Sequence, residues 1–252
     1  MITNNPLILN ITNQVTTHFI ASSLIALGAS PVMSDDPSDA YDLVDITNGI
    51  CLNIGTISSH QMDIMRNVLS NPKAKNIVLD PVGAGASSIR SSACKEILES
   101  GKIDLIRGNA SEISSIAGLS STTRGVDSTM ETKSVEITAD KLAKDRSCIV
   151  VVSGEVDYIT NGTDKYRVNN GASIMAKITG TGCVLSSYLA AVLASGNKSI
   201  ESIAFAVAYY GVLGEKAALD NTGLGNYRER FLDAMSTFHF DSVKPSLRIS
   251  KL

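Results

Sequence analysis

The sequence predicts an α/β protein in which a mostly parallel sheet lies between two layers of helices. Three observations support this fold class. Short apolar runs rich in β-branched residues alternate with longer segments of helical periodicity. Several of these runs are apolar at every position, as in strands that helices cover on both faces. Glycines directly follow two helical segments, at Gly28 and Gly118, and glycine commonly ends a helix.

The expected elements follow in a regular order. The short apolar runs predict buried strands at residues 7–11, 51–54, 77–79, 105–106 and 149–152. The longer patterns predict helices at residues 17–27, 61–69, 94–99, 110–117, 139–144, 184–194 and 202–219. No linker, repeat or low-complexity segment divides the chain. We therefore expect residues 1–252 to form a single domain.

One segment departs from the alternation of strand and helix. Residues 156–160 and 165–168 are β-rich and flank Asn161-Gly162. Asn-Gly between such runs predicts a hairpin with a type I′ turn, which needs a positive φ at both central residues. The hairpin would form either a flap or an edge of the sheet. Periodicity is weak after Phe240, so we expect a poorly ordered tail.

The composition restricts the class of protein. Hydrophobic residues make up 44% of the 252 residues and charged residues 19%, which provides material for a core and argues against disorder. The formal net charge is −3 without a basic patch, which argues against nucleic acid as the main partner. Four isolated cysteines, no signal-peptide pattern and no membrane-length apolar run lead us to expect a cytoplasmic protein without a membrane partner.

The most informative segment is a glycine-rich turn before the helix expected at residues 184–194. It reads Ile178-Thr-Gly-Thr-Gly-Cys183. The N–H groups of Gly180, Thr181, Gly182 and Cys183 would form an anion hole at a helix N-terminus, suited to a phosphoryl group. This position is expected to lower the pKa of the Cys183 thiol, whose thiolate would accept the proton of an attacking hydroxyl. The alternative is a tight turn with a structural cysteine.

Two further turns place charged side chains after expected strands. Asp80 ends one strand before Pro81 and would hold Mg²⁺, although Asp-Pro also simply starts turns. Arg107 follows the next strand and would contact phosphate. Asn109 and Glu112 either form a capping box or face the metal through water, and local spacing leaves both readings open. The glycine-rich turn at residues 178–183 matches neither the Walker A pattern nor the GxGxxG pattern of other nucleotide-binding loops.

Smaller signals complete the set of candidate residues. Ser153 ends a buried strand next to Gly154, where the backbone can approach a nucleotide phosphate or simply turn. Asn13 follows the first strand and ends it with polar groups. Met33 would cover a flat apolar ligand, because a thioether packs well on aromatic rings, or would belong to the core.

Taken together, these segments resemble the hydroxyethylthiazole kinase family of the ribokinase-like superfamily. The resemblance is carried by an ordered set of stretches that covers the chain to about residue 234. They are Ile11-Thr-Asn-Gln-Val15, Ala26-Leu-Gly-Ala-Ser-Pro-Val-Met33, Leu52-Asn-Ile-Gly-Thr56, Leu79-Asp-Pro-Val-Gly-Ala-Gly-Ala86, Ile106-Arg-Gly-Asn-Ala-Ser-Glu-Ile113, Gly125-Val-Asp-Ser128 and Thr179-Gly-Thr-Gly-Cys183.

The resemblance implies a fold, an activity and a role for each matching residue. It implies a ribokinase-like three-layer α/β/α sandwich that phosphorylates the hydroxyl of 4-methyl-5-(2-hydroxyethyl)thiazole in thiamine biosynthesis or salvage, with ATP as co-substrate and Mg²⁺ as cofactor. It also implies a homotrimer with active sites at subunit interfaces. The implied roles are thiazole binding for Met33, Gly180 and Asn13, ATP binding for Arg107 and Ser153, a place near Mg²⁺ for Asp80 and Glu112, and catalysis for Cys183.

Three rival functions are weighed against this one. A ribokinase-like kinase for hydroxymethylpyrimidine or a sugar is disfavoured by Cys183, because many such kinases carry Asp at that place. A nucleotide or thiazole sensor would not need candidates for metal, phosphate and base together. A dehydrogenase of the Rossmann type is disfavoured by the missing GxGxxG pattern.

Overall fold

A nine-stranded sheet organises the residues that the structure describes. The structure is a computed structural model, and it describes residues 1–118, 128–219 and 223–252. The strand order is β2-β1-β3-β4-β5-β6-β7-β8-β9. Neighbours from β2 to β6 pair in parallel, and β6 to β9 pair antiparallel. The expected mostly parallel sheet is therefore confirmed.

The strands are short and follow the expected positions closely. Their bounds are β1 (Leu7–Ile11), β2 (Ser30–Met33), β3 (Gly49–Asn53), β4 (Ile77–Asp80), β5 (Leu105–Asn109), β6 (Ile149–Ser153), β7 (Asp157–Thr160), β8 (Lys165–Val168) and β9 (Ile249–Lys251). Strand β2 is not predicted by the alternation, because its four residues directly follow a helix and none of them is fully buried.

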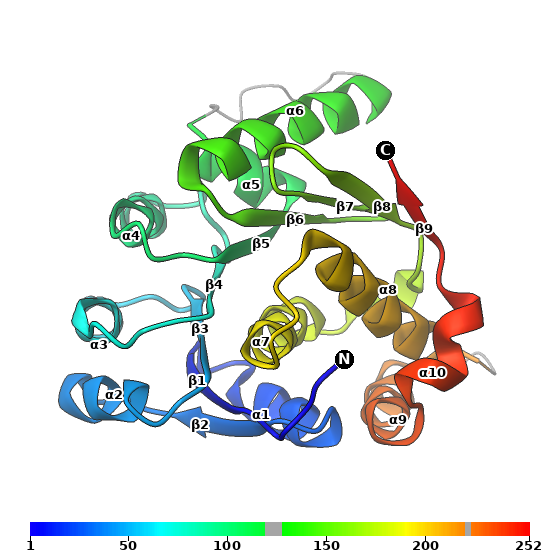
Figure 1. The fold of residues 1–252 in the computed structure, drawn as a ribbon, viewed down its shortest axis with the longest axis horizontal. Helices are drawn as coiled ribbons and strands as arrows, with labels where there is room; N and C mark the ends of the chain where they lie inside the picture. Colours follow the sequence, from blue (N-terminus) through cyan, green and yellow to red (C-terminus); the bar gives the residue numbers. More distant parts are fainter. Residues whose placement is uncertain (119–127, 220–222) are drawn as a thin grey trace.

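Helices cover both faces of the sheet (Figure 1). One face carries α1 (Thr17–Ala26), α7 (Thr181–Ala194), α8 (Ile200–Ala217), α9 (Leu224–Thr237) and α10 (Phe240–Val243). The other carries α2 (Pro37–Val44), α3 (Ser59–Ser70), α4 (Ser88–Glu99), α5 (Ala110–Ile116) and α6 (Ser128–Arg146). The molecule therefore has three layers, as expected.

Each parallel strand contributes to two hydrophobic cores, one on each face. In β6, Ile149 and Val151 pack in the core beneath α7 and α8, and Val150 and Val152 pack in the core beneath α6. This division follows from the two-residue period of a strand. It explains why the runs that predict strands are apolar at every position.

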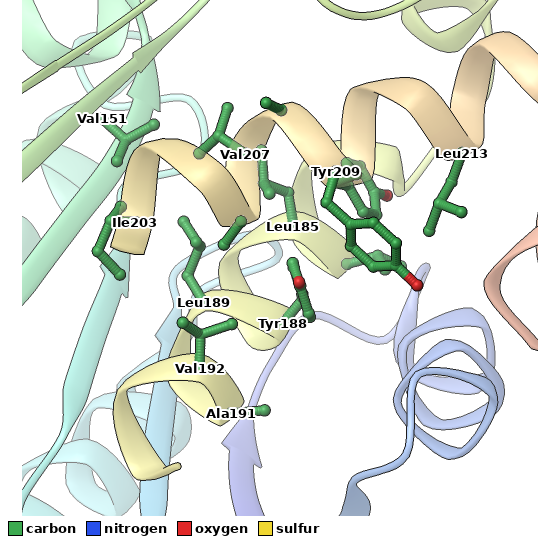
Figure 2. Packing of buried hydrophobic residues seen from close by; sticks show 14 of the residues in the cluster. Val151, Leu185, Tyr188, Leu189, Ala191, Val192, Ile203, Val207, Tyr209 and Leu213 are labelled. Atoms are coloured by element: carbon green, nitrogen blue, oxygen red, sulfur yellow. The ribbon is translucent and has the colours of Figure 1, made fainter. Parts of the chain in front are cut away.

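The core between α7 and α8 fixes the helix that follows the glycine-rich turn. Figure 2 shows Leu185, Leu189 and Val192 of α7 near Ile203 and Val207 of α8. All five side chains are buried or nearly so. A helix buried on this scale is held by packing rather than by its own propensity. The first turn of α7 is therefore held in a fixed place beside the carboxyl ends of the parallel strands.

Helix α2 is missed because its start signal lies in a polar segment. Asp36 caps the helix by accepting hydrogen bonds from the N–H groups of Ser38 and Asp39, at 2.8 and 3.0 Å. Pro37 occupies the first helical turn, where its missing N–H costs nothing. The cap and the proline together were a sufficient sequence signal.

The hairpin forms an antiparallel extension of the sheet, and its turn differs from the expectation. Thr160 pairs with Lys165, so four residues rather than two connect β7 and β8. Gly162 has a φ of 87°, but Asn161 does not have a positive φ. The Asn161 side chain instead accepts hydrogen bonds from the N–H groups of Thr163 and Asp164, at 2.9 and 2.8 Å. The prediction of a type I′ turn is therefore wrong, because a four-residue turn held by the Asn161 side chain takes its place.

The tail also differs from the expectation of poor order. After α10, a short 3₁₀ helix (Lys244–Ser246) leads into β9, which pairs with β8 at the end of the sheet. Pairing with the exposed edge of β8 supplies order that local periodicity does not predict. Across the described residues, no helix is long and apolar enough to cross a membrane.

Candidate functional site

The predicted site residues gather at the carboxyl ends of the parallel strands. Met33, Asp80 and Ser153 are the last residues of β2, β4 and β6. The glycine-rich turn at the start of α7 lies at the same end of the sheet. Polar groups beyond the carboxyl ends of parallel strands commonly bind ligands.

Two glycines let the turn approach its neighbours closely. Gly180 has a φ of 100°, and a Cβ atom there would lie 2.9 Å from Cγ2 of Thr16. A Cβ atom on Gly182 would overlap the guanidinium of Arg107. The positive φ and both close approaches require glycine. The first turn of α7 is thereby enclosed between the start of α1 and Arg107.

Asp80 is completely buried beneath this turn. Its Oδ2 atom accepts hydrogen bonds from Asn53 Nδ2 at 2.8 Å and from Ser186 Oγ at 2.9 Å. Its Oδ1 atom is buried and has no hydrogen-bond partner. Burial raises the pKa of Asp80 to about 6, and the nearby charge of Arg107 opposes the rise. Half of this carboxyl group is thus unused by the protein.

Asn53 links Asp80 to the thiol of Cys183. Asn53 Oδ1 accepts a hydrogen bond from Asn13 Nδ2 at 3.0 Å, and the same Nδ2 lies 3.5 Å from Cys183 Sγ. Asn13 is held in turn by Thr16, whose N–H donates to Asn13 Oδ1 at 3.0 Å. A continuous polar chain therefore joins the carboxylate to the half-buried thiol.

The electrostatics of Cys183 differ from the expectation. Burial raises the pKa of the thiol, and the negative charge of Asp80 raises it further. Hydrogen bonds from Thr16, Asn53 and Asn13 act in the opposite direction but do not compensate. The expected lowering by the helix N-terminus is therefore wrong, because desolvation and a neighbouring carboxylate outweigh it.

Arg107 lies on the other side of the turn, with 14% of its side chain exposed. One guanidinium nitrogen donates a hydrogen bond to Ser153 Oγ. Nη1 is 4.0 Å from Asp80 Oδ1, too far for a hydrogen bond, and Nε is buried without a partner. The structure thus brings a largely buried cation and a buried anion together and leaves one buried polar atom of each unsatisfied.

Glu112 and Asn109 adopt the capping arrangement. Asn109 Oδ1 accepts from the N–H of Glu112 at 2.9 Å, and Glu112 Oε2 accepts from the N–H of Asn109 at 2.8 Å. Glu112 Oε1 accepts from the N–H of Gly83 at 2.9 Å. Both oxygens therefore have structural partners, while the charge still helps to raise the pKa of Asp80.

A cavity of about 960 Å³ opens beside Arg107. It is lined by Arg107, Ser153, Thr181 and Gly182 among the predicted residues, and by residues 169–173 and α8 on the opposite wall. The lining described does not include Asp80, Glu112, Cys183, Asn13, Gly180 or Met33. The polar chain and the cavity therefore meet at the first turn of α7, with the thiol on one side and Arg107 on the other.

Most of the chain matches a known protein family in sequence. The model of the hydroxyethylthiazole kinase family matches residues 1–241. A hydroxyethylthiazole kinase from Leptospira biflexa is 38% identical over 245 residues, which cover 96% of this chain and 92% of the relative. The chain belongs to the hydroxyethylthiazole kinase family. A family member from Methanocorpusculum labreanum is 39% identical over 249 residues, covering 98% and 94% of the two chains.

Solved structures agree with this family and its fold. A hydroxyethylthiazole kinase from Pyrococcus horikoshii superposes with a TM-score of 0.85 at 28% identity, over 98% of this chain and 94% of that chain. A pyridoxal kinase from Staphylococcus aureus superposes with a TM-score of 0.69 at 14% identity, over 99% and 100% of the two chains, which shows the fold alone. The ribokinase-like fold expected of the family is therefore confirmed. One of the stretches that carry the sequence resemblance, residues 125–128, lies almost wholly outside the residues that the structure describes.

Three polar residues at this site of the family fold were missed from the sequence. Asn53 is a polar residue inside the apolar strand expected at residues 51–54, and Ser186 lies one helical turn after Cys183, so both had a local signal. Asp157 lines the cavity and accepts a hydrogen bond from the N–H of Gly154 at 3.0 Å. Burial raises the pKa of Asp157 to about 6. Its position in the hairpin gave no indication of this role in the cavity.

Proposed function

We propose that this chain transfers the γ-phosphoryl group of ATP to the hydroxyl of 4-methyl-5-(2-hydroxyethyl)thiazole, a step of thiamine biosynthesis or salvage. Family membership supports the reaction class and the acceptor. The single observation that carries the proposal is the pair of unsatisfied buried atoms, Asp80 Oδ1 and Arg107 Nε. A buried charge without full pairing is costly, and such a pair is retained where a ligand completes it.

ATP would occupy the cavity beside Arg107. Its volume suits a nucleotide, since ligand pockets commonly measure about 300–1,000 Å³. Arg107 and Ser153 would bind phosphate oxygens, and the N–H groups from Gly180 to Cys183 would receive the phosphoryl group as it transfers. The reaction has a loose transition state, so these residues act by positioning and by stabilising negative charge.

The acidic residues fit a magnesium ion. Among the described residues, no three His, Cys, Asp or Glu side chains gather as a metal site. Mg²⁺ usually takes only one or two carboxylates, with water and phosphate oxygens as its other ligands. Asp80 Oδ1 is free to serve, and Glu112 would act through water because its oxygens cap α5. When bound, Mg²⁺ supplies charge neutralisation for the phosphates.

The thiazole alcohol would bind on the Cys183 side of the turn. Asn13 and Gly180 both lie beside Thr16, so they are close to each other. Met33 would cover the thiazole ring from the end of β2. Cys183 would take the proton of the hydroxyl as it attacks. Because its pKa is raised, the thiolate that does so would be a minority species at neutral pH. We also propose the cytoplasm as the location and a homotrimer with shared sites as the assembly.

The deciding experiment is a phosphorylation assay with the purified chain, Mg-ATP and hydroxyethylthiazole, with the product identified by mass. We expect a gain of one phosphate on the alcohol and loss of turnover when EDTA removes the metal. Hydroxymethylpyrimidine and pyridoxal serve as matched alcohols and should react far more slowly. Thiazole binding without phosphate transfer would contradict the proposal and favour a sensor.

A further inference from the structure

The last residues of the chain are fastened to one wall of the cavity. The wall consists of residues 169–175, which precede and enter the 3₁₀ helix η1 (Ser173–Lys177) and mostly line the cavity. The tail comprises residues 242–252, which lie beyond the part of the chain that the family model matches. Nothing assigned to the site so far requires the tail, so its contacts with the wall need their own explanation.

Asn170 makes the central contact between the wall and the tail. Its side chain is 6% exposed, and its Oδ1 atom accepts a hydrogen bond from the N–H of Arg248 at 2.6 Å. Its Nδ2 atom donates to the carbonyl of Ser246 at 3.0 Å and to Glu215 Oε1 at 3.2 Å. Without the tail, this buried amide would lose two of its three partners, and leaving buried polar atoms unpaired is costly.

Arg248 and Glu215 reinforce the same wall from two sides. The Arg248 carbonyl accepts a hydrogen bond from the N–H of Asn169 at 3.0 Å, and the Arg248 guanidinium donates to the Asn169 carbonyl at 2.6 and 3.0 Å. The guanidinium also contacts Glu215 Oε1 at 2.6 Å, and that oxygen accepts from the N–H of Gly171 at 2.8 Å. Three consecutive wall residues, 169–171, are thus tied to the tail and to α8.

Helix α8 supports the wall from behind. A Cβ atom on Gly211 would lie 2.7 Å from backbone atoms of Asn170. Both Gly211 and Asn170 line the cavity. The wall therefore rests directly on the backbone of α8 and is also hydrogen-bonded to the tail.

We propose that the C-terminal tail is a positioning element for the nucleotide, and that Arg248 and Glu215 act through residues 169–171 to hold wall residues 169–175 where ATP contacts them. This inference rests on the proposed function, because it needs ATP in the cavity. The tail does not touch the polar chain of Asp80 and Cys183 among the contacts described. It should therefore influence nucleotide binding and leave thiazole binding unaffected.

Magnitudes indicate how the tail acts. The Arg248 side chain of the Arg248–Glu215 ion pair is 53% exposed, and exposed ion pairs by themselves contribute little to stability. The Arg248 guanidinium also donates two hydrogen bonds to the Asn169 carbonyl, and these bonds hold the wall in addition to the ion pair. A loosened wall must be ordered again each time the nucleotide binds, and that ordering reduces affinity rather than the rate of chemistry.

The test compares Arg248→Ala with the unaltered chain by calorimetric titration of ADP and by steady-state kinetics. We expect ADP binding and the KM for ATP to weaken by about five- to thirtyfold, with kcat and the KM for the thiazole changed less than about twofold. Hydrogen exchange of residues 169–176 should become faster in the unliganded variant. A second variant, Glu215→Ala, removes the acceptor of Asn170 and Gly171 and should give a similar loss, and the double variant less than the sum.

The matched control is Lys251→Ala, three residues further along the tail, which removes the ion pair between Lys251 and Asp164 and none of the described contacts with the wall. It should leave ADP affinity unchanged. ADP affinity within twofold of the unaltered chain in a folded Arg248→Ala variant would overturn the inference, as would unchanged exchange of the wall. Failure of the unaltered chain itself to bind ADP would instead contradict the proposed function, and the exchange measurement would still decide whether the tail orders the wall.

Discussion

Asp80 and Arg107 are oppositely charged side chains that stop short of full pairing. Their nearest atoms, Oδ1 and Nη1, are 4.0 Å apart, and each side chain retains an unsatisfied buried atom. Such an arrangement costs stability in the free protein, because burial removes water from both charges. In the proposed function, phosphate and metal would complete the pair and offset this cost when they bind.

Asp80→Asn should separate stability from activity. Burial raises the pKa of Asp80 to about 6, so the folded state favours the protonated form and loses stability as pH rises from the ordinary carboxyl value toward 6. A neutral amide avoids this loss. We expect the unliganded variant to be more stable by about 1–3 kcal/mol at pH 7.5 and to lose this advantage near pH 4.

The measurement is denaturant unfolding at both pH values, combined with Mg²⁺ titration of activity. The variant should need more Mg²⁺ and turn over more slowly. An unchanged metal titration would remove Asp80 from the metal role, and a variant less stable at pH 7.5 would show that its hydrogen bonds from Asn53 and Ser186 outweigh the buried charge.

Cys183 should impose an alkaline pH dependence on catalysis. A base must be deprotonated to act, and burial raises the pKa of this thiol. We therefore expect kcat/KM to increase from pH 7 to about pH 9, and Cys183→Ala to lower kcat by about 10²–10⁴. In Cys183→Asp, the carboxylate is ionised by about pH 7, so the rate should be flat above that pH. A loss below threefold in Cys183→Ala would show that the thiol is not the base.

Among the helices and strands, α7 contributes most to the site, because its first turn carries the glycine N–H groups and the thiol of Cys183. It joins the cavity to the polar chain, and the core beneath α7 and α8 fixes its place. A single helix N-terminus would bind an anion only weakly in water. Here the close approach of Arg107 to Gly182 adds a buried cation to the same position.

Gly182→Ala tests that approach. Alanine favours a helix by about 1 kcal/mol over glycine, so the fold should survive. The added Cβ atom would nevertheless displace the Arg107 guanidinium, and we expect the KM for ATP to increase by about tenfold or more. Gly225→Ala in the first turn of α9 is the matched control, since nothing lies near its Cβ position. Equal ATP kinetics in both variants would show that the contact with Arg107 is unimportant.

At the scale of the whole molecule, the proposed homotrimer can be measured directly. Sedimentation equilibrium should give three times the 26.6 kDa mass of the chain. If sites are shared between subunits, specific activity should decrease when dilution separates them. A monomeric mass with full activity would contradict the assembly and would place the complete site within one chain.

Local patterns along the chain were enough to predict the layers of the fold and to name most of the residues that meet around the first turn of α7. Apolar runs and helical periodicity identify β1 and β3 to β6, and the order of short motifs identifies the family. These features are local, because burial on both faces of a strand and a glycine before a helix are written in neighbouring residues. The hairpin was predicted as well, although not its four-residue turn.

Tertiary structure alone decided which charges meet and which atoms stay unsatisfied. Asp80, Asn53, Asn13 and Cys183 come from separate parts of the chain. Burial of Cys183, together with the charge of Asp80, raises the pKa of the thiol that the helix N-terminus was expected to lower. Likewise, β9 is ordered because β8 offers an edge. Desolvation and strand pairing depend on what the fold places nearby, and no local pattern contains that information.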